Sequence, residues 1–118
     1  MAVTMDDVLA FALSLERSYV AVVRERVKVR VGRLVYLAFS RDETMMGFAF
    51  PKDEREALVA GAPDTFLLPE QRAVRYNWVV VRLDRIDERE MRELVLDAWG
   101  MVVPKSLFAA RVARDLDG

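Results

Sequence analysis

The chain has 118 residues, of which 53% are hydrophobic and 31% charged, a composition typical of one folded domain spanning residues 1–118. It contains no cysteine and no histidine, which excludes disulfides, thiolate chemistry and every site that depends on an imidazole. The net charge of −1 supplies no long-range field that would attract the chain to nucleic acid or to an anionic membrane.

The first segment predicts a helix near the N-terminus. Thr4 suits the N-cap, Asp6 and Asp7 suit the positive end of the helix, and apolar residues recur at helical spacing as far as Leu15. The two acids also stand where a signal peptide would carry lysines, and no apolar run reaches the roughly 18 residues of a membrane span. We therefore expect a cytoplasmic protein that does not enter a membrane.

A half-buried strand with one cationic face is predicted over residues 20–31, because residue types alternate there with period two. Gly32 and Arg33 then suit a two-residue hairpin turn. The five cations of this region could contact phosphates of nucleic acid, and they could equally form an ordinary solvated sheet face. These candidate nucleic-acid contacts are Arg24, Arg26, Lys28, Arg30 and Arg33.

Residues 34–39 predict a second strand that is apolar on both faces, which is the pattern of a central strand. A two-residue loop would pair Lys28 with Leu37 and would bring Val35, Leu37 and Phe39 to the cationic face. A row of large apolar side chains on a sheet is rarely left exposed to water, so another part of the structure should cover it. We expect that cover from the last helix or from a second copy in a homodimer.

The remaining sequence predicts three further strands and three helices. The strands are expected at residues 45–50, 66–68 and 76–83. Two helices follow capping-box patterns, Asp53-x-x-Glu56 and Asp87-x-x-Glu90, and the last helix follows Pro104. The order α-β-β-β-α-β-β-α-α, with antiparallel strands and helices gathered on one side, predicts an α+β fold.

Several segments share a pattern with one known group of proteins. They are residues 8–15, 28–36, 75–83, 93–99 and 103–105. Together they resemble the MmcQ/YjbR family of small bacterial proteins. The resemblance implies a two-layer α/β sandwich with an antiparallel sheet, like that of the secretion chaperones, and DNA binding through a double-wing arrangement of hairpins. This chain departs from the family in having Leu34 after the hairpin turn, where members often have lysine, and in lacking the histidines of the late strand.

A second group of cations and aromatic residues surrounds the strand predicted at 76–83. Tyr76 and Trp78 could provide a platform on which bases stack, or they could simply belong to the core and its rim. The basic members of the group form a second candidate anion site. They are Arg72, Arg75 and Lys105.

No motif in the sequence points to catalysis. There is no phosphate-binding glycine loop, no nucleophile elbow and no metal-ligand spacing, so we expect no enzymatic activity, no metal and no cofactor. Two classes of function remain. The first is weak, largely sequence-independent binding of duplex DNA through the cationic hairpin. The alternative is a protein-interaction or homodimerising module with no nucleic-acid role.

Overall fold

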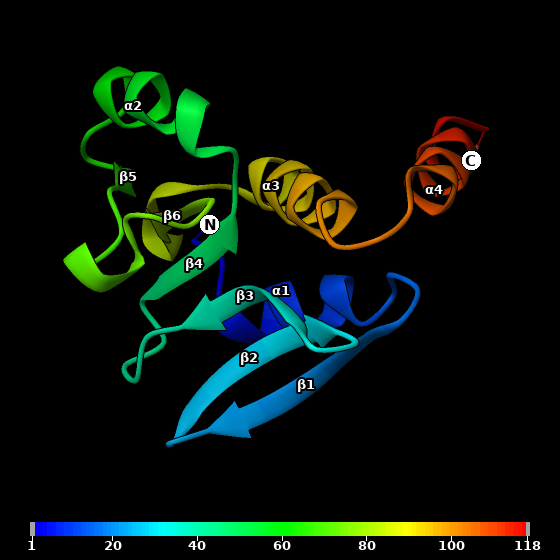
Figure 1. Cartoon of the computed structure of the whole chain (residues 1–118), viewed down its shortest axis with the longest axis horizontal. Coiled ribbons are helices and arrows are strands. Elements are labelled where there is room, and N and C mark those ends of the chain that lie inside the picture. Colours follow the sequence, from blue (N-terminus) through cyan, green and yellow to red (C-terminus); the bar gives the residue numbers. More distant parts are fainter. Residues whose placement is uncertain (1, 118) are drawn as a thin grey trace.

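The computed structural model describes residues 2–117, which form a six-stranded antiparallel sheet and four α-helices (Figure 1). The strands are β1 Ser18–Val23, β2 Arg26–Val31, β3 Leu34–Phe39, β4 Met45–Ala49, β5 Phe66–Leu67 and β6 Trp78–Arg82. The helices are α1 Met5–Ala12, α2 Lys52–Gly61, α3 Glu88–Gly100 and α4 Lys105–Asp117. None of the described helices is long and apolar enough to cross a membrane.

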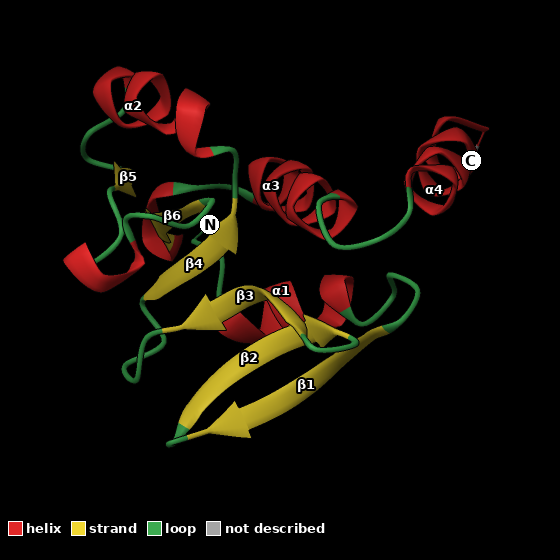
Figure 2. Ribbon diagram, in the orientation of Figure 1, coloured by secondary structure: helices red, strands yellow, loops and turns green. Residues whose placement is uncertain are grey.

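The molecule has two layers (Figure 2). The strand order is β1-β2-β3-β4-β6-β5, so β1 and β5 form the two edges of the sheet. Helices α1 and α3 contact each other, and α3 packs on β3 and β4 in the middle of the sheet. The apolar core lies between these helices and the sheet face they cover, with Trp99 of α3 fully buried. The predicted α+β class with an antiparallel sheet is confirmed.

The segment at 20–31 is two strands joined by a tight turn, so the prediction of one long strand is wrong. Arg24 and Glu25 have φ angles of 52° and 67°, the left-handed conformation of a type I′ hairpin turn. Asparagine and glycine are the usual residues of such a turn, and neither occurs here, so the pattern of the sequence gives no sign of it. The sheet consequently has four strands, and not three, before α2.

A β-bulge between β2 and β3 changes the predicted register. Next to the turn, Arg30 lies opposite Val35, as expected from a two-residue loop. One step further, Val29 lies opposite Leu37, so Tyr36 is an additional residue on β3 without a partner on β2. From this point on, the pairing is displaced by one residue from the predicted one.

The bulge removes two apolar side chains from the cationic face. Leu37 and Phe39 point into the core and have no exposed surface. Val35 stays on the open face, and Lys28 faces the small side chain of Ala38 in place of Leu37. The prediction that Val35, Leu37 and Phe39 form one row is wrong because a one-residue shift in a strand exchanges its two faces.

The last helix does not cover the cationic face, so the expectation that it would do so is wrong. Helix α4 packs at the C-terminal end of α3, where the ring of Phe108 would lie 2.5 Å from a Cβ added to Gly100. Arg111 donates to the carbonyl oxygen of Ser14 at 3.0 Å and lies over the ring of Phe11. These contacts hold α4 away from the sheet (Figure 1).

Of the four predicted helix starts, the one at Asp53 is wrong and the other three are confirmed, since α4 follows Pro104 as expected. Thr4 and Asp87 are N-caps whose side chains accept hydrogen bonds from first-turn amides. The amide of Glu90 donates to Asp87 Oδ1 at 2.8 Å. Helix α2, in contrast, begins after Pro51 without a side-chain cap, and Asp53 lies inside its first turn. A proline that already fixes the entering backbone makes a capping side chain at Asp53 unnecessary.

Removal of the Asp87 carboxylate should weaken α3 measurably. We expect Asp87→Ala to lower the free energy of unfolding by about 1 kcal/mol, since the Glu90 amide loses its acceptor. Urea unfolding would measure this loss. Glu90→Gln is the matched control and should cost less than about 0.5 kcal/mol, because among the described residues the Glu90 carboxylate makes no return bond to Asp87. Equal losses in both variants would contradict the assignment of the cap.

A buried tyrosine links β1 to β3 across β2. The hydroxyl groups of Tyr36 and Ser18 form a hydrogen bond of 2.7 Å on the core side of the sheet. Burial raises the pKa of Tyr36 to about 12, an effect that the bond to Ser18 partly opposes. The neutral phenol is therefore the form that the folded protein favours.

This raised pKa predicts a loss of stability in alkali. Between the unfolded pKa near 10 and the folded pKa near 12, the unfolded chain releases the Tyr36 proton first, so stability falls as the pH rises. At pH 11 the loss should be about 1.4 kcal/mol relative to pH 8. Unfolding of the parent and of Tyr36→Phe at both pH values tests this, since the stability difference between them should shrink by that amount. A constant difference would show that Tyr36 does not titrate as a buried group.

Candidate binding cleft

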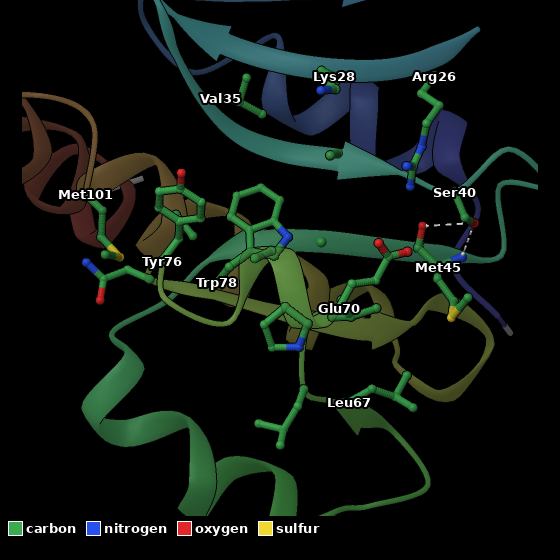
Figure 3. A pocket seen from close by; sticks show the side chains of 18 of the residues that line it. Arg26, Lys28, Val35, Ser40, Met45, Leu67, Glu70, Tyr76, Trp78 and Met101 are labelled. Carbon is green, nitrogen blue, oxygen red and sulfur yellow. Dashed lines mark hydrogen bonds between the residues drawn. The ribbon is translucent and has the colours of Figure 1, made fainter. Parts of the chain in front are cut away.

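The sheet face opposite α1 and α3 carries a cleft of about 820 Å³ (Figure 3). The strand pairing builds its floor by placing the small Ala38 opposite Gly47, while Ala49 lies opposite the large Trp78. The larger Val80 lies on the other side of Gly47. Because alanine and glycine have short side chains or none, they leave space between the longer side chains on either side. The volume of this space is within the range of small-ligand sites.

The two walls of the cleft differ in chemistry. Strand β2 supplies Arg26 and Lys28 on one side. The connection between β5 and β6, which includes the 3₁₀ helix Gln71–Ala73, supplies Glu70 and Tyr76 on the other side (Figure 3). An apolar floor thus lies between a cationic wall and a wall with one carboxylate and one phenol.

The indole of Trp78 lies across Gly47 on this floor. A Cβ built on Gly47 would be 2.4 Å from Nε1, 2.7 Å from Cε2 and 2.8 Å from Cζ2 of the indole. Three neighbouring ring atoms at such similar distances mean that the ring covers the glycine, which only a residue without a side chain permits. Trp78 is half-buried, so part of the ring remains accessible from the cleft.

A buried arginine of α2 holds the wall that carries the aromatic residues. Arg55 is 9% exposed and donates to the carbonyl oxygens of Tyr76 at 3.0 Å and Trp78 at 3.3 Å, and also to that of Val74. Backbone carbonyls take the place of a carboxylate partner, which satisfies the buried guanidinium and fixes the chain on both sides of Tyr76.

Arg55 did not stand out among the cations of the sequence, although one signal could have identified it. Positions 55, 58, 59 and 62 follow the spacing of one helix face, and the other three are apolar. An arginine at the first position of an otherwise apolar stripe is directed toward the interior and needs acceptors there. Its role is therefore structural support of the cleft.

The five candidate nucleic-acid contacts do not form one surface. Arg26, Lys28 and Arg30 share the open face of β2, and only the first two line the cleft. Arg30 is half-buried, and its Nε has no hydrogen-bond partner among the described residues. Arg24 lies in the turn at one end of the strand and Arg33 in the turn at the other end.

The charges of the cationic wall are available to a ligand. Arg26 donates through Nε to the carbonyl oxygen of Phe39 at 3.3 Å, which orients its guanidinium without neutralising it. Lys28 is half-buried beside it. Neither side chain forms an ion pair with a carboxylate in the described part of the chain. Glu70 faces them from the other wall (Figure 3).

The basic residues of the second candidate anion site are dispersed. Arg75 donates to the hydroxyl of Tyr76 at 2.8 Å and lies over its ring, with Cζ 4.9 Å from the centroid. Arg72 is exposed in the 3₁₀ helix, and Lys105 is exposed at the start of α4 on the other side of the molecule (Figure 1). The three cations do not line the cleft, whereas Tyr76 and Trp78 from the same predicted group do.

Comparison with known proteins agrees with this architecture. The family model described as YjbR matches residues 13–101. The chain belongs to the YjbR family. The matched residues of this YjbR protein run from just after α1 to just after α3, so α1 and α4 lie outside the match. A search of curated proteins finds no match.

Among solved structures, the chain is similar to a protein of Deinococcus radiodurans. The crystal structure of protein DR2400, with the family-model domain DUF419, superposes with a TM-score of 0.74 at 20% sequence identity. The alignment covers 87% of this chain and 80% of that chain. At this level of identity, the likeness shows a shared fold.

The close contact at Gly47 predicts the effect of adding a methyl group there. We expect Gly47→Ala to fold but to displace the indole of Trp78, because the new Cβ would lie within 3 Å of three ring atoms. Acrylamide quenching measures this change, since the other tryptophan, Trp99, is fully buried. Gly61→Ala is the control, because a Cβ at Gly61 meets nothing within 4 Å. Unchanged quenching in Gly47→Ala would contradict the position of the ring.

Proposed function

We propose that this YjbR-family protein binds single-stranded nucleic acid in the cleft and catalyses no reaction. The observation that carries the proposal is the accessible indole of Trp78 on the cleft floor, across from Arg26 and Lys28, which form no ion pair within the described residues. Proteins that bind single strands combine these two features, because bases stack on aromatic rings while phosphates follow a cationic surface.

The shape of the site favours a single strand over a duplex. The aromatic rings lie within the cleft, and a base can reach them only if it is free of its neighbours in a stack. In a duplex the bases are paired and stacked, so only the exposed turn residues Arg24 and Arg33 and the open part of β2 would meet phosphates. Those two turns lie at opposite ends of β2 and present one cation each.

The small number of cations predicts a modest affinity with a weak dependence on salt. Two neutralised phosphates on a single strand give a log–log slope of about −1.4, which corresponds to roughly a sevenfold loss between 50 and 200 mM salt. Sequence preference should be slight, because every base presents a ring face to Trp78.

Fluorescence anisotropy with a labelled oligothymidine tests the proposal at about 50 mM salt, where the release of counterions from the nucleic acid still favours binding strongly. Lys28→Glu should weaken binding at least roughly fivefold by replacing a phosphate contact with repulsion. Arg114→Glu changes the net charge equally and lies on α4, away from the cleft, so it should bind like the parent. Loss of affinity in both variants alike would indicate a non-specific charge effect.

A second pair of variants tests the stacking contribution. Trp78→Leu should weaken binding by roughly 5-fold to 150-fold, the range that corresponds to loss of one stacked base, whereas Trp78→Phe should keep most of the affinity. No binding by the parent would overturn the proposal. Equal binding of single-stranded and duplex DNA, unaffected by Trp78→Leu, would show that the cleft is not the binding site. It would favour phosphate contacts along the hairpin.

A further inference from the structure

Strand β1 forms an edge of the sheet that lacks the usual protection against pairing. Its six residues, Ser18–Val23, contain no charge and no proline. On the core side of the sheet, Val20 is 38% exposed and Val22 is 67% exposed, since they extend beyond the helices. Natural edge strands are commonly blocked by lysine, proline or a bulge, and an apolar edge without them is a template for another strand.

We propose that the protein forms a homodimer in which β1 pairs with β1 of a second copy, antiparallel and centred on Ala21. This inference concerns a different surface from the cleft and does not depend on the proposed nucleic-acid function. Two properties of the strand identify a second copy as the occupant: the direction of its free backbone groups, and the match between its side chains and those of a second β1 across a two-fold axis.

The free backbone groups of β1 match this register. The two-residue turn closes on the pair Val23 and Arg26, which in such hairpins is a hydrogen-bonded pair. Because hydrogen-bonded and non-bonded pairs alternate, the amides and carbonyls of Ser18, Val20 and Val22 point away from β2. Antiparallel pairing centred on Ala21 places Val20 opposite Val22 of the second copy, and each has a donor and an acceptor for the other.

The side chains also agree with two-fold symmetry. The two-fold axis runs perpendicular to the sheet, so each residue of β1 lies opposite a residue whose side chain points to the same face. The exposed Val20 and Val22 therefore cover each other on the core side. A register shifted by one residue would place Val20 opposite Ala21 and would turn one sheet over, so that the exposed valines would no longer meet.

The dimer would have one continuous sheet with both clefts on the same side. Since β2 is the neighbour of β1 in each copy, the two cationic strands would be three strand spacings apart, about 14 Å. An extended ligand could then contact both copies at once.

Light scattering of the full chain at high protein concentration tests the dimer. We expect a mass of about 27 kDa, twice the 13.5 kDa of one chain. Val22→Lys should reduce the mass to that of the monomer, and circular dichroism should show that the exposed substitution leaves the fold intact. Leu116→Lys is the matched control, because Leu116 is 83% exposed on α4, and it should remain dimeric. A monomeric parent would overturn the proposal, as would a dimeric Val22→Lys.

A disulfide tests the register independently. Ala21 would face itself across the axis in a non-bonded pair with Cα atoms about 4.5 Å apart, a distance that a disulfide can span. The chain has no cysteine, so Ala21→Cys introduces a single thiol that oxidised glutathione should convert into a covalent dimer. In Val23→Cys the two thiols would be separated by about 14 Å and should not cross-link. Equal cross-linking of both variants would contradict the register centred on Ala21.

Discussion

The additional residue in β3 determines which side of the sheet is core and which side is open. Because Tyr36 has no partner on β2, the alternation of side chains restarts at this point, and both Tyr36 and Leu37 enter the core. Ala38 is thereby placed on the open face opposite Gly47. A regular register would have placed Leu37 beside Lys28 and filled the space that the cleft occupies.

The cleft depends on residues that act by being small or by supporting others. Gly47 allows the indole of Trp78 to lie on the sheet, and the carbonyls bound by Arg55 hold the connection from which Tyr76 and Trp78 enter the cleft. The buried guanidinium of Arg55 costs little because its donors are satisfied by backbone acceptors. In contrast, Arg26 and Lys28 form no ion pair with any carboxylate of residues 2–117, which is the property that a site for anions requires.

The sequence predicts those elements whose signals are local. The caps at Thr4 and Asp87 and the strands β4 and β6 follow from patterns within a few residues. The turn at Arg24 and Glu25 and the bulge at Tyr36 carry no such pattern, because both are imposed by packing against the rest of the sheet. For the same reason the site could be predicted only in parts. Its cations and its aromatic residues are visible in the sequence, but the pairing of β4 with both β3 and β6 brings them together.

The cross-strand register of β2 and β3 is therefore the most direct test of the structure and of the cleft built on it. Nuclear Overhauser contacts between backbone protons of paired residues report this register. The bulged arrangement predicts contacts of Lys28 with Ala38 and of Val29 with Leu37. Contacts of Lys28 with Leu37 and of Val29 with Tyr36 would show a regular register. They would contradict both the division of the sheet into a core face and an open face and the cleft itself.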